Sequence, residues 1–241
     1  RARMIHAGLG LEQPDANKTS SRIIYKKCDQ PLQSETDRIR DLIYKHNIDV
    51  VIIDSMGMAV GGELESAEEV LAFFRAVRQL GNKTSLVVSH SNRQGSIFGS
   101  AYTMNSCRSV WEAKKSSSNA YGMDFNLFHR KANNISLQPA QSWGVDFKDN
   151  RVVYSRGDVF ATDDAGELSY RDLVYRILEK EGGKTREYLK DAIKAIKGDP
   201  PERIDRNVDS AVSKHKADER IEEQDGVLTI KSKDEGKWES I

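Results

Sequence analysis

Apolar positions in the first part of the chain follow a helical period and then the continuous run of a buried strand. Residues 34–47 begin with Ser34 and Asp37 at capping spacing and carry apolar residues three and four positions apart, which predicts an amphipathic helix. The β-branched run 48–54 follows directly. A continuous run of this length predicts a strand buried on both faces, as in the middle of a parallel sheet.

The alternation of helix and strand then continues. Ser66 and Glu69 form a capping box for a second helix, and Gly81 occupies the position of its C-terminal cap. Further strands are predicted over residues 84–90, 108–113 and 123–129, and a closing hairpin over 143–155 with its turn at Asp149-Asn150. The pattern predicts an α/β fold, a mostly parallel sheet with helices on both faces that ends in antiparallel strands.

The last third of the chain has a different pattern. Residues 157–167 are rich in Asp, Thr and Gly and predict a linker. Three helical stripes and a hairpin around Gln224-Asp225-Gly226 follow, the third helix being capped by Asp199 and Glu202 with Pro200 in its first turn. We therefore predict a core over 1–156, a winged-helix-like domain over 168–234 and a tail over 235–241.

Composition narrows the class of protein without identifying it. The 37 basic and 37 acidic residues cancel, so any contact with a polyanion has to come from a local patch. Cys28 and Cys107 lack zinc-ligand spacing and fit a reducing compartment. With no apolar run of about 18 residues, the sequence predicts a soluble, cytoplasmic protein without a membrane partner.

The first candidate for chemistry is the end of the run 48–54. Asp54 and Ser55 stand where a parallel strand would leave the sheet. A carboxylate at this place can hold the water shell of Mg²⁺ beside nucleotide phosphates. The simpler interpretation is an aspartate that caps the following turn.

The next predicted strand ends in Ser89-His90-Ser91-Asn92-Arg93. Taken with Asp54, this order resembles the RecA-like P-loop ATPases, in which the corresponding strand ends in a polar phosphate sensor followed by an Asn-Arg pair. The stretches 97–102 and 108–112 extend the resemblance to phage and plasmid ATPases related to hexameric plasmid-replication helicases. Without the resemblance, His90 would be a histidine that bonds loop backbone.

The resemblance implies a set of roles. ATP and Mg²⁺ would be the cofactors, with Asp54 as the Walker B carboxylate next to Ser55, and His90 would sense the γ-phosphate. The loop 91–105, with Arg93, would contact DNA or couple hydrolysis to movement, and an ordinary surface loop is the alternative. Arg130 or Lys131 would reach the nucleotide of a neighbouring subunit, which implies self-association, with a hexamer as one form. The two residues are adjacent, whereas the family separates its basic pair by one position, and a solvated charged turn is the alternative.

One part of such a site is missing from the sequence. The phosphate-loop pattern GxxxxGK[ST] has no match, and its nearest relative, residues 182–185, has Leu178 where the first glycine is required and follows a helix. We interpret this stretch as a turn in which Thr185 caps the next helix. The resemblance places the phosphate loop upstream of Arg1, so the chain alone is expected not to hydrolyse ATP.

The predicted third helix of the small domain offers a second candidate surface. Its polar face carries Arg203, Arg206, Asn207 and Lys214, which could enter a DNA groove while the wing near Lys231 and Lys233 contacts phosphates. Asp205 and Asp209 dilute this charge. Winged helices also dock proteins, so the fold alone leaves the partner open.

Three functions fit these patterns. The leading one is a DNA-associated, oligomeric ATPase, a helicase or a DNA-remodelling motor. The second is a RecA-like scaffold that does not hydrolyse ATP and binds DNA or a protein through its winged helix. A transcriptional regulator with a ligand-sensing core is the third, and it would require sequence-specific binding to a short duplex.

Overall fold

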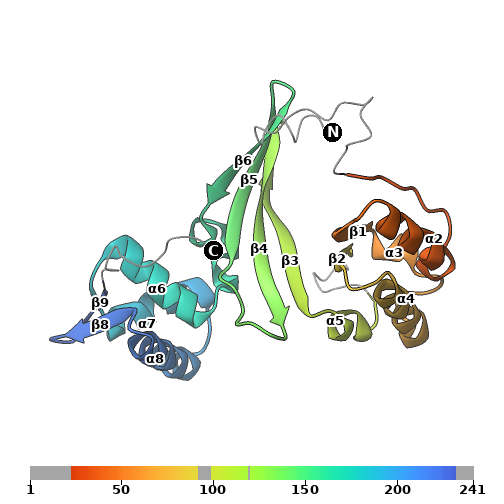
Figure 1. Ribbon diagram of the computed structural model, residues 1–241. Helices are drawn as coiled ribbons and strands as arrows, with labels where there is room; N and C mark the ends of the chain where they lie inside the picture. The colour runs from red at the N-terminus through yellow and green to blue at the C-terminus, as the bar shows by residue number, and fades with distance from the viewer. Residues whose placement is uncertain (1–22, 92–98, 119, 232–241) are drawn as a thin grey trace. The chain divides into compact units, whose positions relative to one another are not determined.

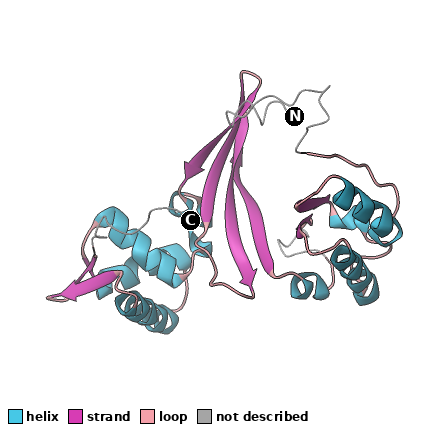
Figure 2. Ribbon diagram, in the orientation of Figure 1, coloured by secondary structure: helices cyan, strands magenta, loops and turns pink. Residues whose placement is uncertain are grey.

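The structure, a computed structural model, describes residues 23–91, 99–118 and 120–231, which fall into two compact units (Figure 1). Within the described ranges, the first unit comprises residues 23–111 and 130–137, and the second comprises 112–129 and 138–231. Both helices and strands are present, and the strands form three separate sheets (Figure 2). The chain is therefore a mixed α/β protein with mostly antiparallel sheets and one small parallel sheet.

The first unit is built around two parallel strands. Its elements are α2 (Leu32–Lys45), β1 (Val50–Asp54), α3 (Met56–Ala59), α4 (Ala67–Gln79), β2 (Thr84–Val88) and α5 (Tyr102–Ser106). Strand β1 pairs with β2 from Val50↔Thr84 to Asp54↔Val88, so the two strands end level with one another. This register positions the candidate nucleotide site.

Local capping chemistry explains α4. The Ser66 hydroxyl accepts a hydrogen bond from the Glu69 amide at 3.4 Å, and Gly81 after the helix has φ 98°, which favours glycine. Phe73 and Phe74 of this helix are buried, with their ring centroids 5.1 Å apart. Both predicted caps of this helix are confirmed.

Helix α2 begins earlier than predicted. Its N-cap is Pro31, with φ −54° and ψ 149°, and no side chain caps it. Ser34 therefore lies in the first turn, and the predicted capping role of Ser34 and Asp37 is wrong. The reason is that proline fixes φ near the helical value and lacks an amide hydrogen, so it starts a helix without a side-chain acceptor.

Strand β1 is covered on one face only. Val51 and Ile53 pack with α2 and α4, whereas Ile52 is 64% exposed and Leu86, on β2, is 55% exposed. The prediction of a strand buried on both faces is thus wrong for the described residues. A continuous apolar run indicates two apolar faces, but it does not identify what covers the second one.

The largest sheet is antiparallel, in the order β3-β4-β5-β6. Its strands are β3 (Ser109–Ser118), β4 (Gly122–Ala132), β5 (Gln141–Lys148) and β6 (Arg151–Gly157). The predicted mostly parallel sheet is therefore corrected to one parallel pair. The connection between β3 and β4 is too short for a parallel crossover, which needs a dozen or more residues.

The hairpin β5–β6 turns where the sequence predicts. Asp149 and Asn150 have φ 49° and 57°, and Lys148 pairs with Arg151 across the turn. Two consecutive positive φ values define a type I′ turn, whose twist matches that of the strands, and Asn and Asp tolerate this conformation best after glycine. The predicted hairpin is confirmed.

Three helices and a small sheet make up the rest of the second unit. After the 3₁₀ helices η1 (Val159–Ala161) and η2 (Asp163–Glu167) come α6 (Tyr170–Glu181), β7 (Lys184–Thr185), α7 (Arg186–Lys197), α8 (Pro201–Ala217), β8 (Ile221–Gln224) and β9 (Val227–Ile230). The strands pair antiparallel in the order β7-β9-β8. Asp225 and Gly226 have positive φ, which confirms the hairpin between β8 and β9.

Helices α6, α7 and α8 pack around one apolar core. Figure 1 shows these helices beside β8 and β9. Leu173, Leu189 and Val208, one from each helix, are completely buried, and each such side chain stabilises the fold by about 1.5–3 kcal/mol. Val159, from the predicted linker 157–167, is buried in the same core.

The starts of α7 and α8 show where capping predictions hold and where they fail. Thr185 accepts from the Tyr188 amide at 3.3 Å, as predicted, and residues 182–185 link α6 to α7 as a turn and short strand. The N-cap of α8 is Pro200 without a side-chain cap, so the caps predicted at Asp199 and Glu202 are wrong. Asp199 instead accepts from the hydroxyl of Tyr170 and pairs with Arg203.

Candidate nucleotide and nucleic-acid sites

The ends of β1 and β2 bring the polar residues of the predicted nucleotide site to one edge of the parallel pair. Asp54 is the last residue of β1 and lies opposite Val88, the last residue of β2. Ser55 follows Asp54 directly, and His90 lies two residues beyond Val88. Asp54 and His90 are both exposed. Parallel strands that end in register therefore place a carboxylate and an imidazole at the same solvent-facing edge.

A metal ion at this edge would take most of its ligands from phosphate oxygens and water rather than from the protein. Within the described ranges, no group of three or more His, Cys, Asp or Glu side chains could enclose a metal ion. Mg²⁺ at nucleotide sites usually takes one or two protein carboxylates and completes its shell with phosphate oxygens and water. An exposed Asp54 with the adjacent Ser55 hydroxyl fits that donor set.

The predicted basic pair divides into two different environments. The Lys131 ammonium donates hydrogen bonds to the carbonyls of Met104, Asn105 and Cys107 at 2.9, 3.2 and 2.8 Å. A cation on the last carbonyls of a helix is stabilised by the helix dipole, so Lys131 fixes the end of α5. Arg130, on the neighbouring position of β4, is exposed. Of the two, Arg130 is the more exposed residue.

Burial next to α5 changes the pKa of the Cys107 thiol. Desolvation raises the pKa of Cys107, and the Lys131 ammonium lowers it by a smaller amount. A thiol with a raised pKa is a poor nucleophile. The raised pKa disfavours a role for Cys107 as a nucleophile.

Part of the predicted DNA loop lies outside the described residues. Arg93 belongs to the segment 92–98, for which the structure gives no description, and Ser91, the neighbour of His90, is the last described residue before it. The candidate role of Arg93 stays a prediction.

Helix α8 separates its charges by side. Asp205 and Asp209 face α7, where Lys190 lies 3.5 and 3.2 Å from them and Arg186 lies 3.5 Å from Asp209. The acids that dilute the helix in the sequence are thus paired within the fold. Their matching i,i+4 spacing with Arg186 and Lys190 is the sequence signal that could have identified this pairing.

The predicted DNA-facing residues of α8 differ in how far they are engaged. Arg203 pairs with Asp199 at 3.3 Å, and Asn207 bonds the Tyr170 side chain. Arg206 and Lys214 are exposed, and no carboxylate of the described chain lies within 4 Å of either. Arg206 and Lys214 are therefore the two cations of this face that are most available to an anion.

The hairpin beside α8 is acidic. Glu222 and Asp225 are exposed, whereas Glu223 accepts hydrogen bonds from Arg186 and Lys216. These two cations lower the pKa of Glu223 to about 2. Lys231 at the base of β9 is exposed, and Lys233 lies outside the described residues. The tip of the hairpin would repel phosphates, so its base is the better place for the predicted wing contact.

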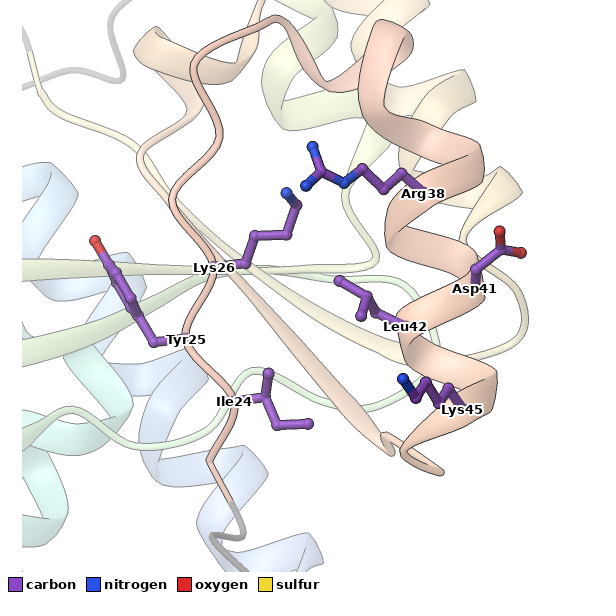
Figure 3. Close-up of a pocket in the computed structure, with 7 residues that line it drawn as sticks. All are labelled: Ile24, Tyr25, Lys26, Arg38, Asp41, Leu42 and Lys45. Carbon is purple, nitrogen blue, oxygen red and sulfur yellow. The ribbon is translucent and has the colours of Figure 1, made fainter. Parts of the chain in front are cut away.

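A surface groove in the first unit lies apart from every predicted site residue. It has a volume of about 440 Å³ and lies between the extended segment at Tyr25 and α2 (Figure 3). The side chains of Lys26 and Arg38 point toward one another across it, and both approach the Glu35 carboxylate, at 3.6 and 3.8 Å. With no catalytic candidate in it, the groove does not locate the chemistry.

Comparison with known proteins does not assign the chain. No protein-family model matches the chain, and a search of curated proteins gives no match. Across the described residues, no helix is long and apolar enough to cross a membrane. The functional argument therefore rests on the geometry of the sites.

Proposed function

We propose that the protein is a DNA-associated ATPase of the RecA-like type, a helicase or DNA-remodelling motor that acts as an oligomer. The observation that carries the proposal is the level ending of β1 and β2, because it brings Asp54 and His90 to one exposed edge. In open α/β sheets, ligands bind beyond the carboxyl ends of the strands. Polar residues at two such ends are what a nucleotide site requires.

The residues have distinct roles in this proposal. Asp54 and Ser55 hold ATP with Mg²⁺, whose positive charge offsets that of the phosphates. His90 donates a hydrogen bond to the terminal phosphate and so distinguishes ATP from ADP. Arg130 extends to the nucleotide of a neighbouring subunit, where a guanidinium can stabilise charge that develops on the transferred group. Lys131, bound to three carbonyls, has a structural role.

The proposal requires a phosphate loop that the printed sequence does not contain. GxxxxGK[ST] is absent from it, and residues 182–185 connect two helices. ATP hydrolysis therefore requires a phosphate loop in addition to residues 1–241. Arg1–Ile241 taken alone is then expected to show no ATP hydrolysis.

DNA association is supported by the C-terminal helices. The order α6-β7-α7-α8-β8-β9, with β7 against β9, supports a winged helix, in which α8 would be the helix that enters a groove. Arg206 and Lys214 are its available cations. The acidic hairpin tip makes phosphate contacts there unfavourable, which leaves the helix face as the contact surface.

The site assignment is tested by substitution in the protein that includes a phosphate loop. Asp54→Asn should lower the Mg²⁺-dependent ATP turnover by about 100-fold or more, because it removes a charge that acts on the phosphates. Asp49→Asn is the matched control, since Asp49 is an exposed aspartate just before the other end of β1. Equal turnover in Asp54→Asn and wild type would refute the assignment.

A scaffold without hydrolysis is the second candidate, and the missing phosphate-loop motif is the observation that favours it. In that case the complete protein binds DNA or a protein through α8 and gives no DNA-stimulated phosphate release. Arg206→Ala with Lys214→Ala should weaken binding in both cases. Measuring phosphate release with and without DNA separates the two functions.

A further inference from the structure

A cleft in the second unit is lined by η1, by one face of α6 and by the turn that follows α8. Its volume is about 830 Å³, which is within the range of small-molecule sites. Val159, Phe160 and Leu168 give the cleft an apolar wall, and Tyr175 and His215 line it from the two helices. An apolar wall with a few polar groups is typical of a site for a small ligand.

His215 brings an unused hydrogen-bond acceptor to this cleft. The side chain is 1% exposed, and its Nε2 donates to the Arg171 carbonyl at 2.8 Å. Burial lowers the pKa of His215, so the imidazole is neutral and Nδ1 is an acceptor. In the described part of the chain, Nδ1 is buried without a hydrogen-bond partner. Since an unpaired buried polar atom is costly, it favours a ligand that donates a hydrogen bond.

Two exposed cations line the same cleft. Arg220 and Lys231 are neighbours, because the Lys231 amide donates to the Arg220 carbonyl at 3.0 Å. No carboxylate of the described ranges lies within 4 Å of either side chain. The Arg220 guanidinium lies 5.9 Å from the centre of the Tyr175 ring, and the His215 ring lies 5.6 Å from it. A cation and the unused acceptor therefore flank one aromatic side chain, within the span of a small ligand.

Most acids of the cleft wall are already engaged. Three of them form ion pairs within the fold, namely Asp158 with Lys180, Glu179 with Arg176 and Asp218 with Arg171. Asp172 accepts from the Ser169 hydroxyl at 2.7 Å in the first turn of α6, where the helix dipole offsets its charge. Glu219 is exposed in the turn before Arg220. The remaining charges are thus two cations and one acid, which favours an anion over a cation as the ligand.

We propose that this cleft binds a small aromatic anion whose ring carries an N–H group. The ring packs against the apolar wall of Val159, Phe160 and Leu168, and its N–H donates to Nδ1 of His215. The carboxylate or phosphate group of the ligand binds Arg220 and Lys231 through charge-assisted hydrogen bonds. The site uses neither Asp54 nor the exposed face of α8, so it goes beyond the proposed function.

Indole-3-acetate is a probe with this donor and this charge, and its binding to the whole chain, without nucleotide or DNA, tests the site by calorimetric titration. Its 1-methyl derivative lacks the donor and should bind about tenfold more weakly, because the His215 acceptor again has no partner. Indole, which lacks the anion, should also bind more weakly, and tryptamine, which carries a cation instead, most weakly. Equal affinity for indole-3-acetate and its 1-methyl derivative would overturn the proposal, as would tighter binding of tryptamine.

Substitution of the two cations tests the anion contact separately. Arg220→Gln with Lys231→Gln should weaken the binding of indole-3-acetate about tenfold and leave that of indole unchanged, because only the charged group loses its partners. Arg151→Gln, at an exposed arginine of β6, is the control and should bind both probes as the wild type does. Equal affinity for indole-3-acetate in the double variant and the wild type would contradict the proposal.

Nitrogen NMR of the wild-type chain gives a readout that does not depend on the stability of a variant. With ¹⁵N-labelled histidine, the Nδ1 resonance of His215 should shift when indole-3-acetate binds and stay in place with the 1-methyl derivative. The resonances of His46, an exposed histidine after α2, should not move. An Nδ1 that is hydrogen-bonded before any probe is added would show that water occupies the acceptor and would refute the proposal. The absence of saturable binding of indole-3-acetate would refute it as well.

Discussion

At the scale of single residues, His215 shows how burial sets the chemistry of a side chain. It is 1% exposed, and its Nε2 lies 2.8 Å from the Arg171 carbonyl. Since a carbonyl only accepts, Nε2 carries the proton. Burial lowers the pKa of this histidine below its ordinary value, and the nearby Arg171 and Arg220 lower it further. His215 is therefore neutral in the folded protein at neutral pH.

This depressed pKa predicts a stability profile. The unfolded chain takes up a proton near pH 6.5 and the folded chain only at lower pH, so the free energy of unfolding should fall as pH drops below 6.5. His215→Gln should reduce that slope, as urea unfolding of the second unit between pH 5 and 8 would show. His46→Gln, at an exposed histidine in the first unit, is the control. An unchanged slope in His215→Gln would contradict the prediction.

Residue roles could be predicted where they depend on register and not where they depend on tertiary contacts. Asp54 ends β1 and His90 follows the end of β2 by two residues, and the sequence alone indicates that they share an edge. Lys131 looks like a surface cation in the sequence. Its three carbonyl partners come from α5 and the residue that caps it, more than twenty residues away, and no local pattern reveals them.

At the scale of elements, the sequence predicts ends and turns best where one residue type is required. The turns at Asp149-Asn150 and Gly226 require positive φ, which few residue types adopt. Thr185 is the only residue of 182–185 whose side chain can cap α7. The sequence therefore identifies both turns and this cap. The caps expected at Ser34 and Asp199 fail because a proline just before each helix starts it by backbone geometry. The prediction of a mostly parallel sheet is wrong because the periodicity of apolar residues does not determine whether two strands run parallel or antiparallel.

The junction of α7, α8 and β8 gives the prediction at this scale. Arg186 and Lys216 donate hydrogen bonds to Glu223 and lower its pKa from 4.5 to about 2. An acid whose pKa is lower in the folded chain stabilises the fold at every pH above its pKa in the unfolded chain. This contribution to the free energy of unfolding is lost as pH falls from 4.5 toward 2. Thermal unfolding of Glu223→Gln should depend less on pH in that range. Glu222→Gln, at the exposed neighbour, should retain the wild-type profile, and the same profile in both variants would contradict the assignment.

At the scale of the whole molecule, the sequence predicts that strands and helices alternate but not how far the sheet extends. The apolar run of β1 suggested cover on both faces, yet the described residues cover one. A second signal lies in the hairpin: Trp143, Val145 and Phe147 recur at every second position, as do Val152, Tyr154 and Arg156, and neither series contains an acid. Read together, they already indicate one apolar face without carboxylates.

Two separate cores predict two separable unfolding events. The first is built around Phe73 with α2 and α4, and the second around Leu173 with α7 and α8; neither core includes a residue of the other. Phe73→Ala should destabilise the first unit by about 3–5 kcal/mol and Leu173→Ala the second by about 2–5 kcal/mol. Hydrogen exchange, read on peptides from β1 and from α8, should show faster exchange only in the unit that carries the substitution. Faster exchange in both units with either variant would mean that the two cores unfold as one, and a substitution in the helical core would then also disturb the edge that carries Asp54.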